Sequence, residues 1–214
     1  MGQIRVTKCE KDGRVIEGLY VIEPTVHEDA RGYFVETYNK RDFEEAGLAM
    51  EFVQDNQSCS VRGVLRGLHY QKQFPQGKLV RALRGRVFDV AVDLRAHSDT
   101  YGMWYGVELT EDNKKQFYIS EGFAHGFLVL SDYAEFCYKC DDVYHPNDEG
   151  GLMWNDPDIG VEWPLDDSVT NEMLKSILFP EKFAATSLYV QPDYPRIHAE
   201  LALPGVNMTL LWME

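Results

Sequence analysis

The strongest constraint on the fold is a series of short β-rich runs separated by turn-forming residues. From Gly18 onward, runs of four to eight residues alternate with polar or glycine-containing separators such as Arg84-Gly85-Arg86. Many short strands at this spacing are typical of an antiparallel sandwich or barrel, and we expect an all-β fold. The predicted strands are Leu19–Ile22, Tyr33–Tyr38, Phe52–Asn56, Val64–Gln71, Leu79–Leu83, Val87–Leu94, Trp104–Leu109, Gln116–Ile119, His125–Leu130 and Ala134–Tyr138.

One short helix is expected early in the chain. Asn39 is a suitable N-cap, Phe43 and Ala46 mark an inner face, and Gly47 suits the C′ position.

The two ends of the chain differ from this pattern. Residues up to Asp12 are expected to form a loose arm. After Pro164 the β pattern stops, residues 166–178 could be helical, and the segment from Phe179 is rich in Pro, Tyr and Leu without a clear period. We therefore expect one β domain over residues 1–178 and a C-terminal extension over residues 179–214.

Composition narrows the class of function. Of 214 residues, 44% are hydrophobic and 26% charged, which is ordinary for a globular protein with a sizeable core. The formal net charge of −14 argues against nucleic acid as a partner, although a few focused cations can still hold a pyrophosphate. No apolar run reaches the length of a membrane span, and the N-terminus lacks a signal-peptide core. We read the four cysteines as reduced thiols and expect a cytoplasmic protein.

The densest group of chemically active residues is Val64–Gln71 followed by residues 76–81. On a strand, residues two apart share a face, so Arg66 and His69 point to opposite faces unless a bulge at Gly67 shifts the register. From the local sequence alone, His69 could be a half-buried barrel histidine as readily as a member of a functional site, and Lys78 could be a solvated turn lysine as readily as a member of that site.

Two further clusters carry candidates. His125 stands between glycines in Glu121–Phe127, and Asp89 is an isolated acid in an apolar strand, where a buried carboxylate needs a partner such as His125. Tyr138 belongs to the third cluster, which Tyr144 and Glu149 follow; tyrosines at such positions commonly just pack.

Taken together, these segments resemble the dTDP-4-dehydrorhamnose 3,5-epimerases and their nucleotide-sugar relatives. The resemblance covers residues 19–164 and is carried by long, unusual motifs. They are Glu23-Pro24, Asp29–Phe34 with Glu36, Phe52–Asn56, Val64–Gln71, Gln76–Arg81, Phe88–Arg95, Glu121–Phe127, Tyr133–Lys139, Trp154–Pro157 and Gly160–Pro164.

The resemblance implies a cupin-type jelly roll that works as a homodimer and inverts carbons beside the keto group of a nucleotide-linked 4-keto sugar. It implies that His69 is the general base, Lys78 the cation beside the keto oxygen, and Tyr138 the acid on the opposite face. A fixed ammonium stabilises the developing enolate oxygen, and a neutral imidazole is a suitable base at neutral pH.

Further residues match binding positions of the family. Those for the nucleotide diphosphate and sugar are Arg66, Gln54, Asn56, Tyr144 and Glu149. Arg31 and Glu36 match positions that reach the nucleotide from the neighbouring subunit, and His125 with Asp89 matches a supporting pair.

No cofactor is expected, and no metal, because the His-x-His pair of metal-binding cupins is absent. The segment in which the family usually carries an aspartate that orients the histidine is not recognisable after Pro164. Asp166, Asp167 and Glu172 are the candidates for that role.

Three readings remain open at the level of the sequence. The first is a 3,5-epimerase acting on dTDP-4-dehydro-6-deoxyglucose. The second is a relative that inverts only C3 or C5, or that takes a GDP or CDP sugar, since His27 stands where the family more often has phenylalanine. The third is a cupin that binds a sugar nucleotide without catalysis.

Overall fold

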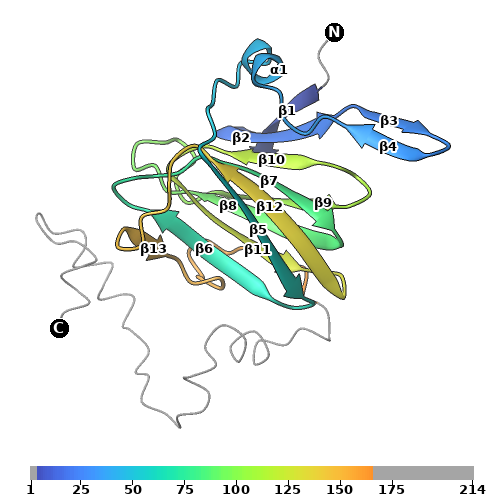
Figure 1. Cartoon of the computed structure of the whole chain (residues 1–214). Coiled ribbons are helices and arrows are strands. Elements are labelled where there is room, and N and C mark those ends of the chain that lie inside the picture. The colour runs from blue at the N-terminus through green and yellow to red at the C-terminus, as the bar shows by residue number, and fades with distance from the viewer. Residues whose placement is uncertain (1–3, 166–214) are drawn as a thin grey trace, which may run out of the picture. The chain divides into compact units, whose positions relative to one another are not determined.

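The computed structural model describes residues 4–165, and these form an almost purely β structure (Figure 1). The elements are β1 Ile4–Lys11, β2 Arg14–Pro24, β3 Val26–Asp29, β4 Gly32–Val35, α1 Lys40–Glu45, β5 Gln54–Val61, β6 Leu65–Gln71, β7 Lys78–Arg84, β8 Arg86–Asp93, β9 Trp104–Thr110, β10 Gln116–Ile119, β11 Phe123–Val129, β12 Tyr133–Cys140 and β13 Glu149–Gly151.

The strands form two main antiparallel sheets. One sheet has the order β1-β2-β10-β7-β12-β5, and the other has the order β13-β6-β11-β8-β9. Strands β3 and β4 form a separate hairpin, which extends away from both sheets in Figure 1. Two facing sheets with many non-sequential neighbours are the arrangement of a jelly roll, so the predicted all-β fold is confirmed.

The main core lies between the two sheets. Val80, Phe117 and Phe136 of the six-stranded sheet are fully buried in one cluster with Val87 and Ala91 of the five-stranded sheet. The alternation of inward and outward residues along each strand places these side chains on the facing surfaces.

The outer face of the five-stranded sheet is also covered. Val92 and Leu128 pack in a second cluster with Trp154 and Trp163, which lie in the segment after β13. The indole Nε1 of Trp163 donates to the carbonyl oxygen of Trp154 at 2.7 Å. Because β11 is buried along its whole length, its residues are held rigidly beside β6.

Helix α1 forms where the sequence predicts it. The Asn39 side chain accepts a hydrogen bond from the Arg41 amide at 3.1 Å, and Gly47 has a φ of +83° just past the helix end. Phe43 is buried as expected, whereas Ala46 is the C-cap and is exposed, because the six-residue helix ends before a second inner position.

Two predictions about the ends of the chain have different outcomes. The expected loose arm before Asp12 is wrong: β1 pairs with β2 from Ile4 to Lys11. Its pattern of charged, mostly exposed side chains gave no hydrophobic period. The predicted helix over residues 166–178 and the boundary near Phe179 lie outside the described residues and stay predictions.

No helix within residues 4–165 is long and apolar enough to cross a membrane. All four cysteines are free thiols, as expected.

Candidate active site

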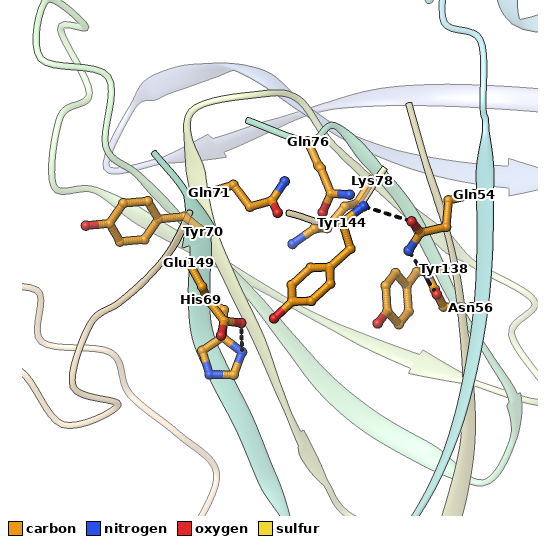
Figure 2. Close-up of a pocket in the computed structure, with 10 residues that line it drawn as sticks. All are labelled: Gln54, Asn56, His69, Tyr70, Gln71, Gln76, Lys78, Tyr138, Tyr144 and Glu149. Atoms are coloured by element: carbon orange, nitrogen blue, oxygen red, sulfur yellow. Dashed lines mark hydrogen bonds and ion pairs between the residues drawn. The ribbon is translucent and has the colours of Figure 1, made fainter. Parts of the chain in front are cut away.

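A pocket of about 340 Å³ opens between the two sheets (Figure 2). Side chains of the six-stranded sheet line one side, and those of the five-stranded sheet line the other. The lining residues are Gln54, Asn56, His69, Tyr70, Gln71, Gln76, Lys78, Tyr138, Tyr144 and Glu149. The pocket therefore gathers residues from segments far apart in the sequence.

A β-bulge in β6 decides where His69 points. His69 pairs with His125 across the β6–β11 ladder, whereas Arg66 pairs with Phe127, so β6 carries one residue more than its partner strand. The extra residue lies around Gly67, the position at which the sequence leaves a bulge open. It places His69 in the pocket.

The surroundings of His69 tune its basicity. Its Nδ1 lies 3.9 Å from Oε1 of Glu149. The His69 side chain is 57% exposed, and the partial burial of its ring lowers its pKa. The Glu149 carboxylate raises this pKa, and Lys78, His125 and Arg66 lower it. The net lowering favours the neutral imidazole, which is the form that can accept a proton.

Lys78 begins β7 and lies opposite Cys140 of β12. Burial lowers the pKa of Lys78, while Cys140 and the carboxylates of Asp89 and Glu149 raise it. The net result is a pKa below the ordinary value of a lysine, and the carboxylates of Asp89 and Glu149 oppose that lowering. The solvated turn lysine is therefore not what the structure contains.

Tyr138 lies on β12, beside Asn56 of β5 and Val80 of β7. Burial raises the pKa of Tyr138, Cys140 also raises it, and the Arg66 guanidinium lowers it. A raised pKa keeps the phenol protonated at neutral pH, so that it can donate a proton.

His69 and Tyr138 come from opposite sheets, with Lys78 in the same pocket. Figure 2 shows the imidazole on the β6 side and the Tyr138 phenol on the side of Asn56. A planar group held between them would present one face to each. That arrangement can remove a proton from one face of a carbon and return a proton to the other.

His125 and Asp89 form the buried pair that the sequence suggests. Nε2 of His125 lies 3.0 Å from both carboxylate oxygens of Asp89. Asp89 is fully buried, which raises its pKa, and His125 lowers it. Neither residue of the pair lines the pocket.

The predicted binding residues fall into two groups. Gln54 and Asn56 are joined through their side chains at 3.0 Å, and Gln54 Oε1 accepts from the Tyr144 amide at 2.9 Å. Both lie in the pocket with Tyr144 and Glu149. The structure brings these four residues together with His69.

The second group lies outside the pocket. Arg66 is exposed on β6 and its Nε donates to the Ser60 hydroxyl at 3.0 Å. Arg31 lies at the tip of the β3–β4 hairpin with its side chain 91% exposed, where it pairs with Asp29, and Glu36 accepts from the Asn39 amide group. Within one chain, Arg31 and Glu36 are not part of the pocket.

Three lining residues were not identified from the sequence, namely Tyr70, Gln71 and Gln76. Gln71 had a detectable signal, because it lies two positions after His69 on the same strand and therefore shares its face. The candidate orienting acids Asp166, Asp167 and Glu172 lie outside the described residues. Within residues 4–165, no group of three or more His, Cys, Asp or Glu side chains could hold a metal ion.

Comparisons with known proteins agree on one family. A family profile described as dTDP-4-dehydrorhamnose 3,5-epimerase matches residues 14–182. A protein of that name from Methanothermobacter thermautotrophicus is 54% identical over 182 residues, covering 85% of this chain and 92% of the relative. One from Pseudomonas aeruginosa is 56% identical over 154 residues, covering 72% of this chain and 85% of the relative.

A solved structure gives the same result. The dTDP-6-deoxy-D-glucose-3,5-epimerase of Legionella pneumophila Philadelphia 1, in complex with dTDP-4-keto-L-rhamnose, has a TM-score of 0.73 and 49% identity. The match covers 78% of this chain and 87% of that one. It confirms the predicted cupin-type jelly roll. The chain belongs to the dTDP-4-dehydrorhamnose 3,5-epimerase family and is a carbohydrate epimerase.

Proposed function

We propose that this epimerase inverts C3 and C5 of dTDP-4-dehydro-6-deoxyglucose and so produces dTDP-4-dehydrorhamnose. The observation that carries the proposal is the placement of His69 and Tyr138 on opposite sheets around a pocket that also holds Lys78. The names of the relatives support the choice of dTDP and of both carbons.

The reaction follows from these three positions. Neutral His69 removes the proton from a carbon next to the ketone. The electron pair of that C–H bond forms a double bond to C4, and the π pair of the C=O bond moves to the keto oxygen. The Lys78 ammonium stabilises the resulting enolate. Tyr138 then gives its proton to the same carbon from the other face, which inverts it. The imidazolium and the phenolate regain their starting protonation by exchange with water.

The same three groups serve both carbons, since C3 and C5 each flank the C4 ketone. Gln54, Asn56, Tyr144 and Glu149 would hold the nucleotide and sugar while Arg66 binds phosphate oxygens near the rim, where a guanidinium forms paired hydrogen bonds. No metal or cofactor takes part in this scheme.

A homodimer completes the site in this proposal, with Arg31 and Glu36 reaching the nucleotide of the partner subunit. The hairpin that carries Arg31 supports this, because Tyr33 and Phe34 are 57% and 68% exposed on it, as expected of a contact surface. We also place the enzyme in the cytoplasm, since its four cysteines are free thiols.

Proton NMR in deuterated water tests the proposed reaction. Incubation with dTDP-4-dehydro-6-deoxyglucose should remove the H3 and H5 signals, because each carbon takes up deuterium when it is reprotonated. Loss of only one of the two signals would mean that the enzyme inverts a single carbon. Loss of the signals only with a GDP or CDP sugar would mean that the substrate carries a different nucleotide. No exchange with any of these sugars would contradict the proposal.

A further inference from the structure

Two loops at the mouth of the pocket carry or deliver several of its residues. The first loop, residues 72–77, connects β6 to β7 and leads directly into Lys78. The second loop, residues 141–148, follows β12, contains Tyr144 and leads into Glu149. The conformations of these two loops therefore set the positions of Lys78, Tyr144 and Glu149.

The two loops are joined to each other by several contacts. The Asp148 carboxylate accepts from the backbone amides of Gln73 and Phe74 at 2.9 Å each. The ring of Phe74 stacks on His145 with centroids 4.2 Å apart. These contacts hold the loops together. The backbone joins the loops to the strand that carries His69 at one end of each: the first loop follows β6 in the chain, and β13, which follows the second loop, pairs with β6.

Gln71 adds a side-chain connection from β6 to the interior of both loops. It is a β6 residue, only 9% exposed, two positions after His69, and Figure 2 shows its side chain in the pocket beside Gln76. Its Nε2 donates to the Phe74 carbonyl oxygen in the first loop at 2.7 Å, and its Oε1 accepts from the His145 amide in the second loop at 2.6 Å. One side-chain amide thus ties both loops to β6.

The chemistry of these two bonds requires an amide or its equivalent. The Phe74 carbonyl can only accept and the His145 N–H can only donate, so the orientation of the Gln71 amide is fixed by its partners. A carboxylate would satisfy His145 but face Phe74 with a second acceptor. An apolar side chain would leave both of these part-buried backbone groups without their partner.

We propose that Gln71 is a positioning residue, which fixes the two loops relative to His69 and thereby preorganises the pocket for the nucleotide sugar. β6 belongs to the five-stranded sheet, and β7 and β12 belong to the six-stranded sheet. The Gln71 amide therefore links the strand that carries the base to the loop that leads into Lys78 and to the loop that contains Tyr144.

Two variants separate this role from simple packing and from charge. Gln71→Met keeps the length of the side chain but makes neither hydrogen bond at any pH. Gln71→Glu loses the bond to Phe74 when ionised and recovers it when protonated, because a neutral carboxylic acid has one donor and one acceptor. The probe is dTDP, which rests on the proposed function, and its Kd is measured by calorimetry from about pH 8 to about pH 5.

Gln71→Met should weaken dTDP binding about tenfold relative to wild type at every pH, since fewer molecules hold the competent loop conformation. Gln71→Glu should be at least as weak near pH 8 and approach wild type near pH 5. An unchanged Kd in Gln71→Met would overturn the proposal, because the loss in Gln71→Glu would then be charge repulsion alone. A loss of dTDP affinity in Gln71→Glu that does not vary with pH would also overturn the proposal.

Gln57→Glu is the matched charge control. Gln57 is an exposed residue of β5 outside the pocket, where it donates to Glu135 at 3.3 Å. Its substitution adds the same charge away from the loops, and the Kd of the variant for dTDP should stay within about twofold of wild type. Thermal melting checks that each variant is folded. If Gln71→Met does not fold, the pH dependence of dTDP binding by Gln71→Glu tests the proposal.

Amide hydrogen exchange gives a readout that is independent of the ligand. The His145 amide should exchange faster in Gln71→Met than in wild type, and in Gln71→Glu it should stay protected, since a carboxylate still accepts that bond. A wild-type protein that fails to bind dTDP would contradict the proposed nucleotide, and the exchange of His145 would then test Gln71 by itself. Equal protection in wild type and Gln71→Met would refute the positioning role.

Discussion

The charge of Glu149 acts on His69 across 3.9 Å, and it raises the imidazole pKa that burial lowers. Replacing Glu149 by glutamine removes the charge and keeps the shape. The pKa of His69 should fall further, so the base stays neutral to lower pH. We predict that the acid limb of the kcat/KM profile of Glu149→Gln moves to lower pH than in wild type.

The control for this prediction is Glu135→Gln, on β12 outside the pocket, which should leave the acid limb where it is. The position of the limb is the readout, because Glu149 is also proposed to bind substrate and its loss lowers the rate for that reason alone. A limb that stays in place or moves to higher pH in Glu149→Gln would contradict the proposed electrostatic control of His69.

At the scale of single residues, the sequence predicted which side chains line the pocket better than it predicted their pKa shifts. His69, Lys78 and Tyr138 could be chosen because their motifs are distinctive. The directions of the pKa shifts could not be predicted, because they depend on burial between strands that lie far apart in the sequence. The place of Gln71 in the pocket could have been predicted from its spacing to His69, but its bonds to the two loops could not, because the partners are backbone atoms that leave no residue pattern.

Strand β6 depends on a glycine at the bulge. Gly67 has a φ of +122°, and a Cβ there would lie 2.5 Å from Cα of Gly126 and 2.7 Å from the carbonyl oxygen of His125. We predict that Gly67→Ala costs about 3 kcal/mol of unfolding free energy or more, from backbone strain and overpacking together. Urea unfolding measures this cost, and activity should be lost with it because His69 is displaced.

Gly13→Ala is the matched control for this change. Gly13 also has a positive φ, +73°, but no atom lies within 4 Å of the added Cβ. It should cost only about 1–2 kcal/mol and leave activity intact. Similar costs at the two positions would show that β6 does not need the close approach of Gly67 to β11.

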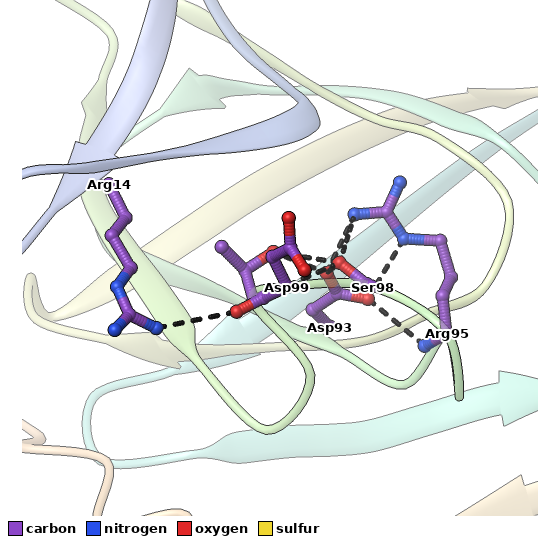
Figure 3. Close-up of polar contacts among 6 residues, drawn as sticks. Arg14, Asp93, Arg95, Ser98 and Asp99 are labelled. Carbon is purple, nitrogen blue, oxygen red and sulfur yellow. Dashed lines mark hydrogen bonds and ion pairs between the residues drawn. The ribbon is translucent and has the colours of Figure 1, made fainter.

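The connection between β8 and β9 is held by a buried carboxylate (Figure 3). Burial raises the pKa of Asp93, but hydrogen bonds from Arg95, Ser98 and Thr100 outweigh it and bring the pKa to about 2. The Arg95 Nη2 and the hydroxyls of Ser98 and Thr100 lie 2.6, 2.7 and 2.7 Å from Oδ2. This cluster does not line the pocket, and we therefore assign it to the stability of the fold.

A lowered carboxyl pKa means that the stabilisation is present above the unfolded pKa and is lost as pH falls toward about 2. We predict that Asp93→Asn lowers the unfolding free energy by about 2 kcal/mol at pH 7, and that its difference from wild type shrinks below about pH 4. Asp99 is an exposed neighbour, and Asp99→Asn should change the unfolding free energy by less than about 0.5 kcal/mol. A pH-independent difference for Asp93→Asn would contradict the assignment.

At the scale of elements, the apolar strands were predictable and the polar ones were not. Strands such as β8 and β11 have the β-rich composition that the sequence shows directly. β1, β3 and β13 were missed because they are charged, very short, or contain glycine, and only pairing with a neighbour makes them strands. The bulge was predictable, since glycine inside a strand is unusual.

For the whole molecule, the main prediction is a homodimer with a shared site. Static light scattering at micromolar concentration should give twice the 24.6 kDa of one chain. A stronger test mixes subunits. Arg31→Ala and His69→Asn dimers are each expected to be nearly inactive, but a mixed dimer has one site with both wild-type residues.

Refolding an equal mixture should restore about a quarter of wild-type activity, because about half of the dimers are mixed and each has one intact site. No gain on mixing would mean that Arg31 serves its own chain. A monomeric mass with full activity would contradict the shared site altogether.

The central claim is that His69 and Tyr138 act on opposite faces of the same carbon, and Tyr138→Phe tests it most directly. Deuterium uptake and inversion are measured together by proton NMR on dTDP-4-dehydro-6-deoxyglucose. Exchange should continue with retention, since His69 still forms the enolate beside Lys78, while inverted product falls about 10²–10⁴-fold. His69→Asn should lose both. Equal loss of exchange and inversion in Tyr138→Phe, or full activity in His69→Asn, would contradict the account.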